Sequence, residues 1–111
     1  ALAIARETNG DAHPEVAKVV LNLAELELAE RDYPAARAHI TEALEIFETS
    51  LGPDHDLVAQ CLRERALVAR LTGELDRARA DYARAREILA AQFGPEAPQV
   101  REIDEDLAKV Q

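Results

Sequence analysis

The 111-residue sequence is poor in several residue types that often mark a compartment or a reaction. Its single cysteine, Cys61, excludes an internal disulfide. Tryptophan and methionine are absent and aromatic residues make up 4%, so any core must be built from aliphatic side chains. No apolar run reaches the roughly 18 residues that a membrane span needs, and no secretory signal is visible at the start. We therefore expect a cytoplasmic protein.

Basic residues are in the minority. Lys and Arg number 13 against 22 Asp and Glu, which gives a formal net charge of −9. Nucleic-acid modules and polybasic membrane patches need a basic face, so neither kind of partner is expected. The chain is 48% hydrophobic and rich in Ala, Leu, Glu and Arg, all strong helix formers. The composition predicts an ordered, helical protein.

Glycine is also rare, and its spacing is the clearest pattern in the chain. Gly10, Gly52 and Gly94 lie 42 residues apart, and the residues after them repeat as well, with Val16-Ala17 matching Val58-Ala59. A period of this length indicates a solenoid of helical repeats. We predict a single domain with the end of an earlier repeat, two whole repeats, and a partial repeat or capping helix, at residues 1–9, 10–51, 52–93 and 94–111.

Each whole repeat predicts two helices. In the first repeat Pro14 suits a first helical turn, and Asp32 suits the N-cap of a second helix that ends at Gly52. In the second repeat the same reasoning predicts helices from about Asp54 to Leu71 and from about Leu75 to Gln92. Alanines mark the places where helices approach closely, and the larger neighbours Leu23, Ile40, Leu44 and Tyr82 are expected to fill the gaps beside them. Tyr33 is expected on the buried stripe of its helix.

These motifs resemble tetratricopeptide repeat (TPR) arrays of the 42-residue, kinesin-light-chain-like type. The resemblance rests on the Gly-Pro-Asp-His loop at 52–55, the Leu-Asn-Leu-Ala motif at 21–24 and the two Val-Ala pairs. It implies an all-α fold, a right-handed superhelical solenoid of antiparallel helix pairs. It also implies a non-enzymatic scaffold for protein–protein interaction, part of a larger bacterial regulatory or signalling protein.

Two departures from the family pattern carry predictions. Arg31 stands where the family has Gly, so this turn is either relaxed or strained, and an Arg in the left-handed conformation would cost about 1 kcal/mol. Arg65 stands on the inward stripe of its helix, where the family has Leu. Either its stem packs and its head group reaches water, or it pairs with Glu27 or Asp104, since an unpaired buried charge is costly. We predict the pair.

No residue constellation points to catalysis, a metal or a cofactor. His13 and His55 occupy the same place in successive repeats, too far apart to share an ion, and are expected to form hydrogen bonds at helix starts. Cys61 aligns with Val19 and Ile103 and is expected to be a core thiol. There is no glycine-rich phosphate loop, so neither an enzyme nor a bound cofactor is expected.

In the family, the first helix of each pair lines a concave groove that holds a peptide. Carried over position by position, the resemblance implies three groups of groove candidates, one from each repeat: Lys18, Leu21, Asn22, Glu25 and Leu28; Gln60, Arg63, Glu64, Leu67 and Arg70; and Glu102, Glu105, Asp106 and Lys109.

Carboxylates outnumber cations at these positions, so we expect a partner segment that carries Lys or Arg beside aliphatic residues. Two alternatives remain open: the candidates are ordinary exposed helix positions, and the segment is a structural spacer or self-association module without a peptide ligand. An open apolar end, with Leu2 and Ile4 in an incomplete repeat, predicts contact between chains there.

Overall fold

The computed structural model describes residues 13–110, and all regular structure in that range is helical. The prediction of an all-α fold is confirmed. None of the described helices is long and apolar enough to cross a membrane. The helices are α2 (Pro14–Ala29), α3 (Tyr33–Leu51), α4 (Asp56–Leu71), α5 (Leu75–Phe93) and α6 (Pro98–Ala108).

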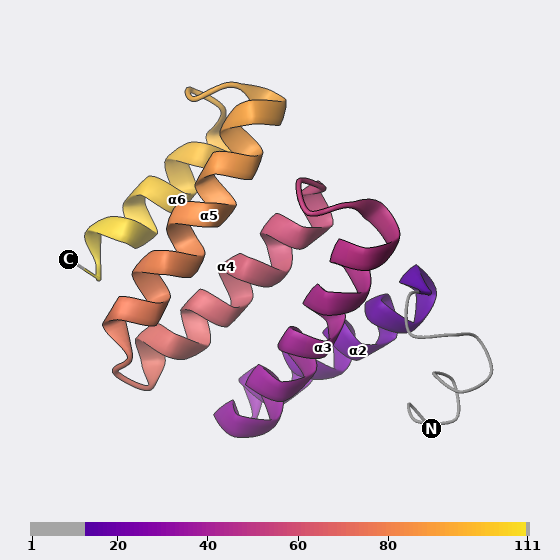
Figure 1. The fold of residues 1–111 in the computed structure, drawn as a ribbon. Coiled ribbons are helices and arrows are strands. Elements are labelled where there is room, and N and C mark those ends of the chain that lie inside the picture. Colours follow the sequence, from indigo (N-terminus) through magenta and orange to yellow (C-terminus); the bar gives the residue numbers. More distant parts are fainter. Residues whose placement is uncertain (1–12, 111) are drawn as a thin grey trace. The chain divides into compact units, whose positions relative to one another are not determined.

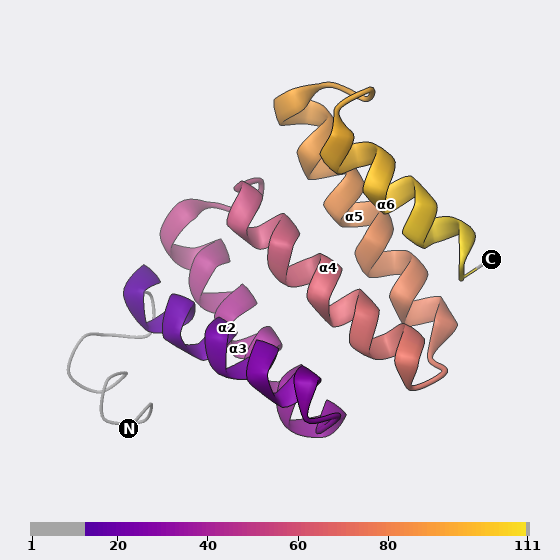
Figure 2. The ribbon, with the colours of Figure 1, turned by 180° about the vertical axis from the view of Figure 1, so that it is seen from behind.

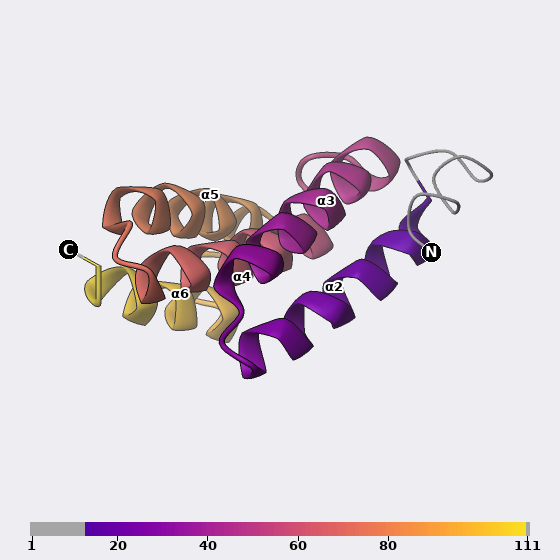
Figure 3. The same ribbon diagram turned by 90° about the horizontal axis from the view of Figure 1, so that it is seen from below.

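The chain divides into two compact units, residues 1–55 and 56–111. Unit 1 contains α2 and α3, packed as an antiparallel pair (Figure 3). Unit 2 contains the antiparallel pair α4 and α5, with α6 packed along α5 (Figures 1 and 2). The division lies close to the repeat boundary that the glycine spacing predicts. Leu2 and Ile4, on which the predicted chain-to-chain contact rests, lie outside the described residues.

Local signals place the helix ends. His13 is the N-cap of α2, and its Nδ1 accepts a hydrogen bond from the backbone N–H of Glu15 at 3.2 Å, as the expected role at a helix start requires. Asp32 is the N-cap of α3 and accepts from Ala35 N–H at 3.5 Å. The predicted boundaries need two small corrections: α4 begins at Asp56 and not near Asp54, and α5 ends one residue later than predicted.

The short turn inside each helix pair uses a positive backbone φ. Gly73 has φ +84° between α4 and α5, a conformation that glycine adopts without steric cost. Arg31 holds the corresponding turn between α2 and α3 with φ +64°. The left-handed arginine considered from the sequence is therefore present, and unit 1 carries local strain that unit 2 avoids.

Small residues form the seams between paired helices. Six predicted seam alanines have no exposed surface: Ala24, Ala36, Ala43, Ala66, Ala78 and Ala85. Ile40, Leu44 and Tyr82 are buried beside them, as is Cys61. Two expected core residues differ, since Leu23 is 37% exposed and Tyr33 is only half-buried. Leu23 lies on a side of α2 that packing with α3 does not cover.

Arg65 forms an ion pair with Asp81, which was not among the partners predicted for it. Its Nε and Nη2 donate to the two carboxylate oxygens of Asp81 on α5, at 2.8 and 2.9 Å. The alternative with a solvated head group is wrong, because the guanidinium makes this two-pronged bond in a partly buried place. Of the predicted partners, Glu27 lies against His39 of α3 and Asp104 accepts from Arg86 of α5. Arg65 and Glu27 are partly buried, and each is met by a side chain of the helix packed beside it, whereas Asp104 is exposed.

Candidate functional site

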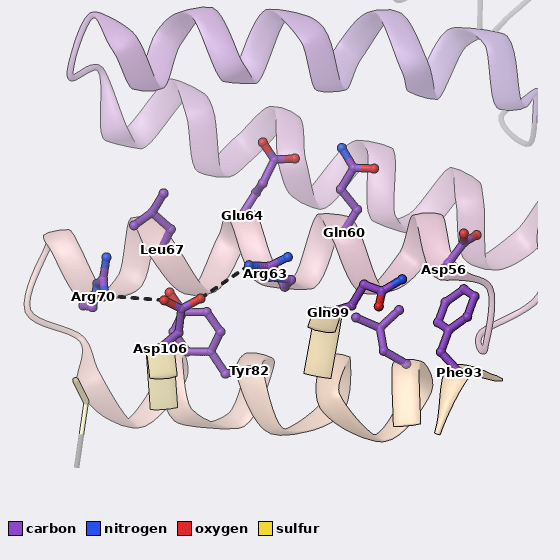
Figure 4. A pocket seen from close by; sticks show the side chains of 11 residues that line it. Asp56, Gln60, Arg63, Glu64, Leu67, Arg70, Tyr82, Phe93, Gln99 and Asp106 are labelled. Atoms are coloured by element: carbon purple, nitrogen blue, oxygen red, sulfur yellow. Dashed lines mark ion pairs between the residues drawn. The ribbon is translucent and has the colours of Figure 1, made fainter. Parts of the chain in front are cut away.

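An open groove of about 600 Å³ lies within unit 2. This volume falls in the range of about 300–1,000 Å³ that is typical of ligand sites. Residues from α4, α5 and α6 line it, and both polar and apolar side chains contribute (Figure 4). They are Asp56, Gln60, Arg63, Glu64, Leu67, Arg70, Tyr82, Leu89, Phe93, Gln99 and Asp106.

One end of the groove is charged. Asp106 of α6 lies between two arginines of α4, with its Oδ2 3.6 Å from Arg63 Nη2 and its Oδ1 4.0 Å from Arg70 Nη1 (Figure 4). Arg63 also lies 3.4 Å from Glu102 of α6. These pairs tie α6 to α4 across the groove and neutralise much of the charge at this end. Because the distances are long and the groups partly exposed, each pair contributes only about 0.2–1 kcal/mol.

Tyr82 belongs to the same end and is almost fully buried. Burial raises the pKa of its hydroxyl above the ordinary value, and the neighbouring Asp106 carboxylate raises it further, while Arg70 and Arg63 oppose the change. Tyr82 is therefore a neutral phenol at physiological pH, and its ring forms part of the floor of the groove.

The opposite end is more apolar. Phe93 is the last residue of α5 and 49% exposed, and Leu89 lies one turn before it. Asp56 and Gln99, from the first turns of α4 and α6, border the same end (Figure 4). An exposed aromatic ring beside polar groups is a common anchor for a partner's side chain.

The comparisons with known proteins agree with this architecture. The sequence model of the tetratricopeptide repeat family matches residues 15–91. The chain belongs to the TPR family. Among solved structures it is similar to BtubC (BKLC) from P. vanneervenii, a kinesin-light-chain-like TPR protein, at 25% identity and a TM-score of 0.86. That match covers 98% of this chain and 44% of BtubC, so the chain spans less than half the length of its structural relative. The search of curated proteins gave no match.

The structure brings together part of the predicted TPR groove. Six of the candidates named from the sequence line the groove of unit 2: Gln60, Arg63, Glu64, Leu67, Arg70 and Asp106. Glu102 and Lys109 lie at its rim, 60% and 61% exposed, and contact Arg63 and Asp106 respectively. Glu105 is exposed on α6 and does not line it.

The candidates from the first repeat lie on α2 in unit 1. Lys18, Asn22 and Glu25 are exposed, and Lys18 pairs with Glu15 at 3.4 Å. Leu28 is half-buried, whereas Leu21 is only 5% exposed and therefore offers little surface to a ligand. Their part in binding stays a prediction.

The resemblance missed the groove residues that come from α5, because it assigns the groove to first helices. Tyr82 was expected in the core, where its ring does lie, and Leu89 and Phe93 received no role. The sequence does contain an indication that Phe93 is exposed. It is one of two phenylalanines in the chain and stands directly before Gly94, which ends the helix. An aromatic residue at a helix end has fewer neighbours to cover it than one in the middle.

Proposed function

We propose that the chain is a non-catalytic protein–protein interaction scaffold that binds a partner segment in the groove of unit 2. TPR repeats are in general interaction modules without catalytic activity. The observation that carries the proposal is the open groove itself, which combines an exposed aromatic end with a charged end. In the described part of the chain, no group of three or more His, Cys, Asp and Glu residues is arranged to hold a metal ion.

The proposed partner carries Lys or Arg beside apolar residues. Three carboxylates and two guanidiniums line the groove, and both arginines already face carboxylates of α6. An incoming cation therefore meets acidic groups, whereas an incoming carboxylate must compete with Asp106. The net charge of −9 adds long-range attraction for a basic segment. Phe93 and Leu67 supply apolar contacts between the charges.

Two fluorescent probe peptides of equal length test the partner chemistry, one alternating Lys with Leu and the other Glu with Leu. Fluorescence anisotropy is expected to detect binding of the Lys peptide, weakening as salt rises, because exposed charges are screened over about 8 Å at physiological ionic strength. Preference for the Glu peptide would contradict the proposed charge. Binding of neither peptide would favour the alternative of a structural spacer.

Matched variants test the place of binding. Phe93→Ser is expected to weaken binding of the Lys peptide more than Leu71→Ser does. Leu71 is equally exposed, at 50%, but lies outside the groove. Glu102→Lys at the rim is expected to weaken it more than Glu87→Lys on the exposed side of α5. Equal losses of affinity for the two variants of each pair would show that the peptide does not bind in this groove.

A further inference from the structure

A carboxylate of α6 lies among cations at the charged end of the groove. The oxygens of Asp106 are 3.6 Å from Arg63 Nη2, 4.0 Å from Arg70 Nη1 and 4.0 Å from Lys109 Nζ (Figure 4 marks the two arginine pairs). Each of these distances is longer than a hydrogen bond. Asp106 therefore balances the charge of these cations without a tight bond to any of the three.

The positions of the two arginines do not depend on Asp106 alone. Arg63 and Arg70 are seven residues apart on α4, so their side chains leave the same side of the helix, two turns apart. Arg63 Nη1 also donates to Glu102 Oε2 at 3.4 Å, and this second carboxylate holds the guanidinium while Nη2 faces Asp106. Without the charge of Asp106, two guanidiniums would remain turned toward one place, which is the arrangement that binds a carboxylate.

We propose that Asp106 is the residue that determines which charge the groove accepts. It occupies, from within the chain, the place between Arg63 and Arg70 that a carboxylate of a partner would need. Asp56 also lines the groove but lies at the opposite end, so it does not have this role (Figure 4). The inference rests on the proposed function, because it places the partner segment in this groove.

The substitution Asp106→Asn tests the assignment, because it keeps the shape of the side chain and removes its charge. In fluorescence anisotropy with the two probe peptides, the variant is expected to bind the Glu peptide several-fold more tightly than the unmodified chain does. It should bind the Lys peptide several-fold more weakly. Both changes follow from the two guanidiniums that then lack a carboxylate between them.

Glu105→Gln is the matched control. It removes the same charge one residue earlier on α6, where the side chain is exposed and does not line the groove. The ratio of the affinities for the two peptides should therefore stay close to that of the unmodified chain. An equal change of this ratio in Asp106→Asn and Glu105→Gln would overturn the assignment, as would an unchanged ratio in both.

Two double variants locate the binding of the Glu peptide. Adding Arg70→Gln to Asp106→Asn should abolish the gain, because one of the two guanidiniums is lost. Adding Arg77→Gln should preserve it, since Arg77 is 68% exposed on α5 and lies outside the groove. The two double variants have the same net charge, so equal losses would show that the gain came from overall charge and not from this place.

Two further measurements keep the outcomes apart. Asp106→Ala repeats the test with a strong helix former, and circular dichroism shows whether each variant is folded. If the unmodified chain binds neither peptide, the proposed function fails. A gain of Glu-peptide binding in Asp106→Asn would still support Asp106 as the residue that excludes acidic segments, and the lack of any gain in both Asp106 variants would overturn it.

Discussion

Unit 1 and unit 2 link their paired helices by polar contacts at the same place, but with different residues. In unit 1, His39 Nδ1 of α3 lies 2.6 Å from Glu27 Oε1 of α2. In unit 2, Asp81 of α5 occupies the position of His39 one repeat later and accepts from Arg65 of α4. The second helix thus contributes an imidazole in one unit and a carboxylate in the other. The repeat specifies where a polar link is tolerated, and the neighbouring helix decides which group completes it.

The units also differ in charge. Residues 1–55 hold four basic and eleven acidic side chains, a net charge of −7, and residues 56–111 hold nine and eleven, a net charge of −2. In unit 2, ion pairs join α4 to α5, α4 to α6 and α5 to α6. Electrostatic contacts therefore join all three helices of unit 2 to one another.

The largest expected effect comes from the link in unit 2. Arg65→Met should lower the free energy of unfolding by about 2 kcal/mol, because it removes two charge-assisted hydrogen bonds from a carboxylate that is 14% exposed. Urea denaturation measures the loss. The double variant with Asp81→Leu should recover most of it, since no buried charge then remains. A loss in the double variant as large as in the single one would contradict this explanation.

The link in unit 1 should be weaker. Glu27→Gln is expected to cost about 1 kcal/mol, since one hydrogen bond is weakened and not two. Glu25→Gln, on the exposed side of the same helix, serves as the control and should leave the urea midpoint unchanged. If both variants had the same midpoint, the contact between Glu27 and His39 would contribute nothing to stability.

Substitutions at the two turn residues should change the stability of the chain in opposite directions. Gly73→Ala is expected to destabilise the chain by about 1 kcal/mol, because φ +84° is strained for any residue with a Cβ atom. Arg31→Gly should relieve the strain at φ +64° and stabilise it by about 0.5 kcal/mol, since added chain entropy in the unfolded state offsets part of the gain. Thermal unfolding measures both shifts; shifts of the same sign would contradict the comparison.

The caps of the second helices offer a smaller difference. The Asp32 side chain accepts a long hydrogen bond at the start of α3, whereas Glu74 makes no side-chain cap bond at the start of α5. Asp32→Ala is therefore expected to cost about 0.5 kcal/mol, at the low end for an N-cap. Asp32→Asn, which keeps the acceptor, should restore the thermal midpoint.

Tyr82→Phe should have the smallest effect at neutral pH and a distinct one in alkali. Burial raises the pKa of Tyr82 in the folded state above 10.0, the ordinary value of an exposed tyrosine. The contribution of the neutral Tyr82 hydroxyl to the free energy of unfolding is fully present below pH 10. It declines as pH rises above that value toward the folded-state pKa. Unit 1 has Ile40 at this position and lacks the effect. When the free energy of unfolding is measured at a series of pH values from 8 upward, it should fall less steeply with pH for the variant. An equal pH dependence for both proteins would contradict the assignment.

The features predicted correctly from the sequence are those with local causes. Helix ends depend on residues within one or two turns, such as Pro14, Asp32 and Gly52, so their signals can be read along the chain. The alanine seam follows from the 42-residue period, because equivalent small residues permit the same close approach in each repeat. Even the strained turn at Arg31 could be anticipated, since the corresponding Gly73 marks a position that needs positive φ.

The partner of Arg65 could not be predicted in this way. Glu27 and Asp104 were considered because they break the apolar pattern, whereas Asp81 lies on a helix full of charges and gave no such signal. Which charge meets Arg65 depends on how α5 is rotated against α4. Packing of the apolar residues sets that rotation, and single-residue patterns do not record it.

The sequence by itself determined the helix pairs, their approximate bounds and the TPR family, and it named Gln60, Arg63, Glu64, Leu67 and Arg70 but not Asp56 among the α4 residues that line the groove. Only the tertiary structure decided that α5 contributes Tyr82, Leu89 and Phe93, and that Asp106 lies between Arg63 and Arg70. The reason is physical. Helix formation and repeat period arise from interactions between residues close in the chain, whereas a groove is made by side chains from three helices whose contacts depend on how all of them pack.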